Sequence, residues 1–172
     1  ATRTATATAT PCPSQFSDVP VGSTFYDNIR CLACRGIIGG YADGTFRPNN
    51  EITRGQIAKM VSNSANFNEP ISGETYQDVP SSNTFYVWIE RLSRRGVMGG
   101  YNCGGAGEPC NADNRPYFRP FANATRGQLS KIVSNAAGFS DTPTGQTYTD
   151  VTSDNPFDVW FARSINRCLM GG

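Results

Sequence analysis

The chain has 172 residues, and its 15 Lys and Arg residues nearly balance 14 Asp and Glu residues, which leaves a net charge of +1. This balance gives no attraction to nucleic acid or to an anionic membrane surface, and no stretch approaches the roughly 20 apolar residues of a membrane span. There is no histidine, which removes the commonest general base and metal ligand. We therefore expect a binding or structural protein that needs no metal or other cofactor.

Residues 1–15 form a tail in which Ala and Thr alternate before the sequence Pro-Cys-Pro. One interpretation is a disordered linker. The other is an extended strand docked on another surface, because strict alternation with a β-branched residue suits a strand. We prefer the linker.

From residue 16 onward the chain repeats itself. An aromatic residue followed two positions later by Asp-Val opens each copy, with the aspartates at Asp18, Asp78 and Asp150. Such self-similarity indicates one supersecondary unit used several times. We define repeat 1 as residues 16–75, repeat 2 as residues 76–147 with a cysteine-bracketed loop insertion, and the first half of repeat 3 as residues 148–172. The repeated aspartates are expected to brace each unit.

The first helix of each repeat is marked by apolar residues with helical spacing. These positions, all expected to be buried, are Phe25, Ile29, Leu32, Phe85, Ile89, Leu92, Phe157 and Phe161. Gly36 and Gly96 follow the helices of the two complete repeats, where a left-handed C-terminal cap favours glycine.

The second helix of each complete repeat begins with the sequence Thr-Arg-Gly-Gln. Thr53 with Gln56, and Thr125 with Gln128, have the spacing of a capping box, in which each side chain bonds to the other residue's backbone amide. Together, the two helices of each repeat predict a mainly α fold with little sheet.

Six cysteines suit an oxidised, extracellular setting. Cys103 and Cys110 bracket a short Gly-rich loop and are expected to form a disulfide. Three pairings are open to the other four, and we prefer Cys12–Cys31 with Cys34–Cys168. A zinc site at Cys31-x-x-Cys34 is disfavoured by the spacing of the nearest other cysteines, and a calcium site in the 102–114 loop lacks the helix-loop-helix ligand pattern.

The Asp-Val openings, the loop Gly-Gly-Tyr-Ala-Asp-Gly-Thr-Phe-Arg-Pro (39–48) and the Thr-Arg-Gly-Gln motifs resemble the S-layer homology domain over residues 16–172. The resemblance implies a pseudo-threefold, mostly helical cluster of repeats in an extracellular, cell-surface protein. It also implies non-covalent anchoring to cell-wall polysaccharide, often a pyruvylated polymer held in grooves between repeats. The alternative is a structural subunit that binds copies of itself to build a filament, sheath or surface layer.

The resemblance assigns binding of the polymer carboxylate to Arg54 and Arg126. A guanidinium fork matches a pyruvate-ketal carboxylate bidentately, although each Arg could instead make a structural ion pair between repeats. Trp88 and Trp160 could stack on sugar rings, but packing in the core is favoured. A glycosidase would need one special carboxylate pair without equivalents in the other copies. We see no such pair and expect no catalysis.

Overall fold

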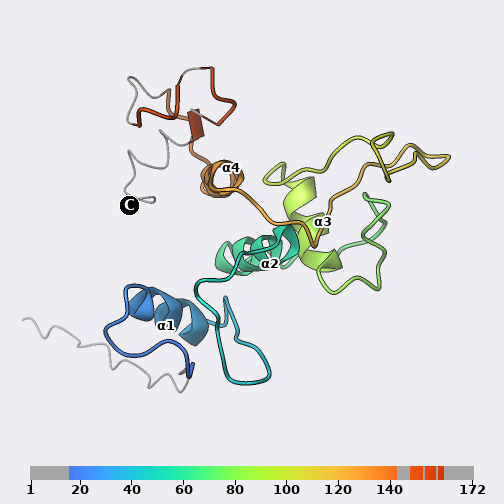
Figure 1. Cartoon of the computed structure of the whole chain (residues 1–172). Helices are drawn as coiled ribbons and strands as arrows, with labels where there is room; N and C mark the ends of the chain where they lie inside the picture. Colours follow the sequence, from blue (N-terminus) through green and yellow to red (C-terminus); the bar gives the residue numbers. More distant parts are fainter. Residues whose placement is uncertain (1–15, 143–147, 153, 158, 161–172) are drawn as a thin grey trace, which may run out of the picture. The chain divides into compact units, whose positions relative to one another are not determined.

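The computed structural model describes residues 16–142, 148–152, 154–157 and 159–160 (Figure 1). Its regular structure there consists of four helices: α1 (Tyr26–Cys34), α2 (Arg54–Ser64), α3 (Tyr86–Arg94) and α4 (Arg126–Ala136). Pairing between extended segments in these ranges is limited to isolated bridges. The predicted mainly α fold is therefore confirmed. The tail, Cys12, Phe161 and Cys168 lie outside the described residues.

Among the described helices, none combines the length and the apolar character needed to cross a membrane.

The chain divides into two compact units, Ala1–Asn50 and Glu51–Gly172. The first unit holds α1, and the second holds the other three helices. Within the second unit α2 packs against α3. The second helix of repeat 1 therefore belongs structurally with the first helix of repeat 2, and the structural division precedes α2.

Glycine ends the first helix of both complete repeats. Gly36 and Gly96 have φ angles of 67° and 65°, a conformation that costs glycine little. The amides that follow them, Ile37 and Val97, donate to Leu32 O and Leu92 O at 3.0 and 2.9 Å. These bonds satisfy carbonyls that the end of a helix leaves unpaired, which confirms the predicted caps.

Capping boxes begin both second helices, as predicted. Thr53 Oγ1 accepts from the Gln56 amide at 3.3 Å, and Gln56 Oε1 accepts from the Thr53 amide at 2.9 Å. The corresponding distances between Thr125 and Gln128 are 3.2 and 3.1 Å. These reciprocal bonds satisfy donors at the helix start and fix where each helix begins.

The aspartates of the Asp-Val openings brace the loops of their own repeats. In the first unit the carboxylate of Asp18 accepts from the amides of Phe46 and Arg47 at 2.8 and 2.7 Å. The bond from Phe46 is the largest cause that lowers the pKa of Asp18. In the second unit Asp78 accepts from Phe118 and Arg119 at 2.8 and 2.6 Å. The bracing role is confirmed for both residues.

The core of the second unit lies around α2, α3 and α4. Phe85 packs so closely on α2 that a Cβ atom at Gly55 would lie 2.4 Å from its Cδ2 atom. Phe157 makes the same contact with Gly127 on α4, at 2.7 Å. The buried apolar cluster comprises Ile57, Ala58, Tyr76, Val79, Ile89, Leu92, Val97, Met98, Phe118 and Ile132.

The burial expected for Phe25 is wrong, because its side chain is 52% exposed. Ile29, Ile89 and Leu92 are buried as predicted, whereas Leu32, Phe85 and Phe157 are half-buried. Phe85 and Phe157 are each covered by a helix glycine. Among the residues described in the first unit, no helix glycine covers Phe25, so the same position in the repeat stays exposed.

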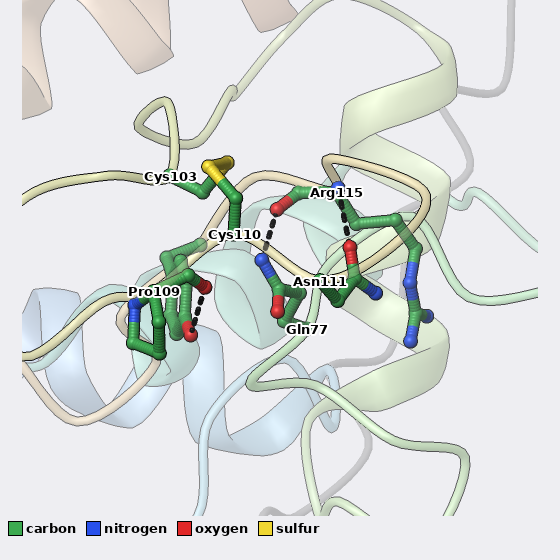
Figure 2. The surroundings of a disulfide bond; sticks show 7 residues. Gln77, Cys103, Pro109, Cys110, Asn111 and Arg115 are labelled. Atoms are coloured by element: carbon green, nitrogen blue, oxygen red, sulfur yellow. Dashed lines mark hydrogen bonds between the residues drawn. A yellow bond between two sulfur atoms is a disulfide. The ribbon is translucent and has the colours of Figure 1, made fainter.

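The disulfide between Cys103 and Cys110 is confirmed, with 5.0 Å between the two Cα atoms (Figure 2). The preferred Cys12–Cys31 pairing is wrong, because Cys31 is a free, exposed thiol. Cys34 is the disulfide-bonded residue of this pair. Residues three apart lie side by side on a helix, so their spacing could not decide which of the two is bridged. The pairing with Cys168 stays a prediction, since that residue lies outside the described ranges.

Three arginines of α3 and its C-terminal cap hold the segment that follows α2. Arg91 Nε donates to Glu69 O at 3.1 Å, and Arg94 donates to the carbonyl of Ser72. Arg95 forms an ion pair with the Glu69 carboxylate at 2.8 Å. Chiefly because of this bond to Arg95, the pKa of Glu69 falls from 4.5 to about 2.

Acid should weaken this connection between about pH 4.5 and pH 2. The folded-state pKa of Glu69 is depressed, so its contribution to stability is present above the unfolded-state value and is lost as the pH falls through the folded-state value. We expect the thermal midpoint of Glu69→Gln to depend less on pH in this window than that of the wild type. Calorimetry at several pH values tests this, and equal slopes would contradict it.

Gly55→Ala should destabilise the second unit. The added Cβ atom would enter the Phe85 ring, and overpacking of this kind costs about 1–3 kcal/mol. Gly99→Ala is the matched control, because a Cβ atom there meets nothing within 4 Å. Urea denaturation should show a loss for Gly55→Ala alone. Equal stability of the two variants would mean that the ring can move aside.

Candidate functional site

Arg54, the first candidate for polymer binding, is a buried structural residue. Its side chain is 5% exposed, and burial lowers its pKa. Nε donates to Phe118 O at 2.8 Å, and Nη2 donates to Gly99 O at 2.6 Å. The guanidinium carbon also lies 5.0 Å from the centre of the Tyr101 ring. Arg54 therefore joins α2 to the loop of repeat 2 and offers little of its guanidinium to a ligand.

The backbone at the start of α2 is engaged by the same loop. Helix starts leave amide donors without intrahelical partners. At α2, the Arg54 amide donates to Ala122 O at 2.9 Å, and the Gly55 amide donates to Pro120 O at 2.8 Å. The helix start and the loop are therefore complementary, with donors on one side and carbonyl acceptors on the other.

Arg126, the second candidate, has the equivalent place at the start of α4 but a different environment. Its side chain is exposed, and it lines a pocket of about 480 Å³. Among the described residues, no hydrogen-bond acceptor is found for the amides of Arg126 and Gly127 or for the guanidinium of Arg126. The other lining residues are Thr125, Gly127, Tyr148, Asp150, Val151, Asn155 and Phe157.

The chemistry of this pocket suits a ligand that carries both an acidic group and hydroxyl groups. A guanidinium beside helix-start amides favours a carboxylate or another anion. The carboxylate of Asp150 repels an anion placed next to it, but it can accept hydrogen bonds from hydroxyl groups, and Asn155 can both donate and accept. Phe157 adds an apolar wall.

Asp150 is a lining residue that the sequence analysis assigned to a brace. Asp18 and Asp78 each accept two amides of a Phe-Arg segment. No such donors to Asp150 are found in the part of the chain that the structure describes, and the residue instead lines the pocket. The repeat pattern identified this aspartate, but an aspartate acts as a brace only where a Phe-Arg segment offers its two amides to the carboxylate.

Both tryptophans lie partly buried beneath a lysine from the facing helix. Trp88 Nε1 donates to Asn63 Oδ1 at 3.0 Å, and Lys59 Nζ lies 4.8 Å from the centre of its ring. Lys131 lies 4.5 Å from the ring of Trp160 in the same way. Each ring thus has a contact within the protein, and sugar stacking on it stays a prediction.

The described residues contain no cluster of three or more His, Cys, Asp or Glu side chains placed to hold a metal ion. In the 102–114 loop, the Glu108 carboxylate pairs with Arg119 at 2.7 Å. Asn111 Oδ1 accepts from the Arg115 amide at 2.9 Å. Two side chains whose oxygens this loop could offer to a calcium ion therefore already have protein donors.

Among known protein families, the S-layer homology domain matches residues 15–58. This match agrees with the repeated motifs described above. The chain contains an S-layer homology domain. Residues elsewhere in the chain carry the same motifs, and the two complete repeats share capping boxes and aspartate braces.

Proteins similar to this chain include outer membrane proteins. The chain is 48% identical to outer membrane protein SlpA of Thermus thermophilus over 48 residues, which cover 28% of this chain and 5% of the relative. SlpA of Deinococcus radiodurans is 39% identical over 61 residues, which cover 36% of this chain and 5% of that protein. An endoglucanase of a Bacillus species is 30% identical over 114 residues, which cover 63% of this chain and 11% of the endoglucanase. The matched parts thus span only a small fraction of these relatives, while the family and the SlpA proteins confirm the predicted cell-surface location.

Replacing the two equivalent arginines should have very different effects on stability. Arg54→Ala leaves two carbonyls without their charged donor, and we expect it to lower the free energy of unfolding by about 2–4 kcal/mol. Arg126→Ala removes an exposed side chain and should change it by no more than about 0.5 kcal/mol. Chemical denaturation of both variants tests this. A large loss for Arg126→Ala would assign that residue a structural role as well.

Proposed function

We propose that this S-layer homology protein attaches to a cell-wall polysaccharide through the pocket at the start of α4. The Arg126 guanidinium binds an acidic group of the polymer, for which the carboxylate of a pyruvate ketal is the candidate. The observation that carries this proposal is the contrast between the two arginines. Arg54 is buried on two carbonyls, whereas Arg126 is exposed and lines a pocket.

Electrostatics at the pocket support an anionic ligand. The partial positive charge of a helix N-terminus adds to that of the Arg126 side chain. A carboxylate can accept from the guanidinium and from the helix-start amides together, and hydrogen bonds to charged groups contribute about 1.5–3 kcal/mol. Since the pocket is open to solvent, binding should weaken as salt concentration rises.

We propose further that the chain is not catalytic. Hydrolysis of a glycosidic bond requires two carboxyl groups on either side of the bond. The described lining of the pocket includes one carboxylate, Asp150. The endoglucanase relative is named for its own reaction, and the matched segment covers 11% of it.

Self-association is the second proposal, and the exposed apolar residues of the first unit favour it. Phe25 is 52% exposed and Val21 is 79% exposed. Large exposed apolar side chains that lie together mark surfaces for protein contacts. A subunit contact on this unit would be compatible with anchoring through the second unit.

Arg126→Ala should weaken binding to purified wall polysaccharide by about 10- to 100-fold, as expected for the loss of a charge-assisted contact. Arg126→Lys should recover part of the affinity, because lysine keeps the charge but not the bidentate geometry. Arg30→Ala is the matched control, since Arg30 is also exposed but lies in α1. Co-sedimentation with intact and depyruvylated polymer measures all of these affinities.

The proposal fails if Arg126→Ala and Arg30→Ala bind equally well. If the wild-type protein binds the depyruvylated polymer as well as the intact polymer, the acidic group is not the pyruvate ketal. Negative-stain microscopy of the same samples separates the two proposals. Ordered assemblies that form without polymer favour self-association, and single particles that coat only the polymer favour anchoring.

A further inference from the structure

The same arrangement of an arginine, a tyrosine and a carboxylate recurs in both complete repeats, and we call it the Arg–Tyr brace. In repeat 1, Arg47 lies 4.0 Å from the centre of the Tyr41 ring and pairs with Asp43 at 2.8 Å. In repeat 2, Arg119 lies 3.9 Å from the centre of the Tyr101 ring. Its Nε and Nη2 atoms donate to the two carboxylate oxygens of Glu108 at 2.7 and 2.8 Å.

The two braces obtain their carboxylate from different places. Asp43 lies four residues before Arg47 in the same turn. Glu108 instead lies within the inserted loop of repeat 2, between the two bridged cysteines. The only other residues between those cysteines are Gly, Ala and Pro, and glycine-rich backbone is intrinsically flexible. Within the loop the Gly104 amide donates to Glu108 O at 2.7 Å, and the Glu108 amide donates to Gly105 O at 3.0 Å. The disulfide closes the chain around this turn. The position of the repeat 2 carboxylate therefore depends on the turn and the bridge together, whereas that of repeat 1 involves no bridge between these cysteines.

Figure 2 shows how the rest of this loop is held. Asn111 Oδ1 accepts from the Arg115 amide, and Gln77 Nε2 donates to Arg115 O at 2.5 Å. Both contacts lie on the C-terminal side of Cys110. On the other side of this cysteine, the Tyr117 hydroxyl donates to Pro109 O at 3.1 Å. Because Cys110 is exposed, a small thiol can reach the bridge.

The repeat 2 brace connects directly to the start of α4. The Tyr101 hydroxyl accepts from Gln128 Nε2 at 3.2 Å. Through Oε1, the same glutamine side chain accepts from the Thr125 amide at 3.1 Å and closes the capping box. Arg126 is the next residue after Thr125 and lines the pocket. Contacts therefore run without interruption from Glu108 through Arg119, Tyr101 and Gln128 to the helix start.

We propose that the Cys103–Cys110 disulfide is a redox-sensitive device that orders the start of α4 through Glu108 and the Arg–Tyr brace of repeat 2. In the reducing step, a dithiol attacks the bridge as a thiolate, forms a mixed disulfide and then closes into its own disulfide. Two electrons and two protons reach Cys103 and Cys110, which become thiols. The freed loop no longer holds Glu108 on Arg119, and the Tyr101 side chain and Gln128 lose the part of their support that runs through Arg119, while the backbone of Tyr101 stays paired with Tyr117.

One consequence rests on the function proposed above: reduction would lower the affinity of the Arg126 pocket for wall polymer. The ordering of the helix start does not depend on that function and is measured separately. Repeat 1 supplies the internal comparison, because the bridge between Cys103 and Cys110 does not hold its carboxylate.

The test is amide hydrogen exchange on the full chain, followed residue by residue by NMR. The probes are the amides of Gln128 and Leu129, which donate to Thr125 Oγ1 and Thr125 O. In the double variant Cys103→Ser with Cys110→Ser, exchange at these amides should be about two- to fivefold faster, the range expected from losing a partly exposed ion pair. The amides of Phe46 and Arg47, which Asp18 holds in repeat 1, should be unchanged.

Glu108→Gln in the oxidised protein separates the ion pair from the bridge. It should reproduce the faster exchange at Gln128 with the disulfide intact, and Asp43→Asn, the equivalent change in repeat 1, should not. Dithiothreitol also reaches the disulfide of Cys34. Its effect at Gln128 should therefore appear in the wild type and be absent in the double serine variant.

Unchanged exchange at Gln128 in both the double serine variant and Glu108→Gln would overturn the proposal. Should the double variant fail to fold, Glu108→Gln decides alone. Polymer affinity then distinguishes the two proposals. Normal binding by the double variant, with weak binding by Arg126→Ala, overturns redox control of the pocket only. If exchange at Gln128 is faster in the variants but Arg126→Ala binds the polymer normally, the redox-sensitive ordering of α4 is supported and the proposed function is contradicted.

Discussion

The buried guanidinium of Arg54 is the interaction on which the second unit depends. It lies at the start of α2 and bonds to carbonyls at Gly99 and Phe118, which lie on either side of the inserted loop. A charged group without water must have its donors satisfied. This requirement fixes both ends of the loop relative to the helix, so the insertion between them can vary without displacing α2. It also explains why α2 belongs to the same unit as repeat 2.

Identical motifs acquire different roles because their surroundings differ. The capping boxes of α2 and α4 match bond for bond, since capping involves only residues within the motif. The arginine that follows the capping threonine points beyond the motif, and its role depends on what it meets. Arg54 donates to two carbonyl oxygens, while Arg126 is exposed in a pocket that Asp150 and Asn155 also line. The same motif thus places one arginine on carbonyls of the chain and leaves the other exposed in a pocket.

Features set by nearby residues could be predicted from the sequence. The glycine caps, the capping boxes and the Cys103–Cys110 bridge each depend on a few neighbouring positions, and all were predicted. Features set by distant partners could not. The exposure of Phe25 depends on a covering helix, and the burial of Arg54 depends on a loop 45 and 64 residues away. The choice between Cys31 and Cys34 likewise depends on the position of a third cysteine.

The insertion in repeat 2 shows which geometry the repeat must keep. Arg47 and Arg119 both adopt left-handed backbone angles, with φ of 60° and 59°, which carry a cost for residues other than glycine. Each is held there by an aspartate on its amide and by a tyrosine beneath its guanidinium. Repeat 2 has no aspartate in the turn before Arg119, yet Glu108 returns a carboxylate to the same guanidinium. The strained arginine therefore retains the same three kinds of contact, and the inserted loop supplies the one that the turn lacks.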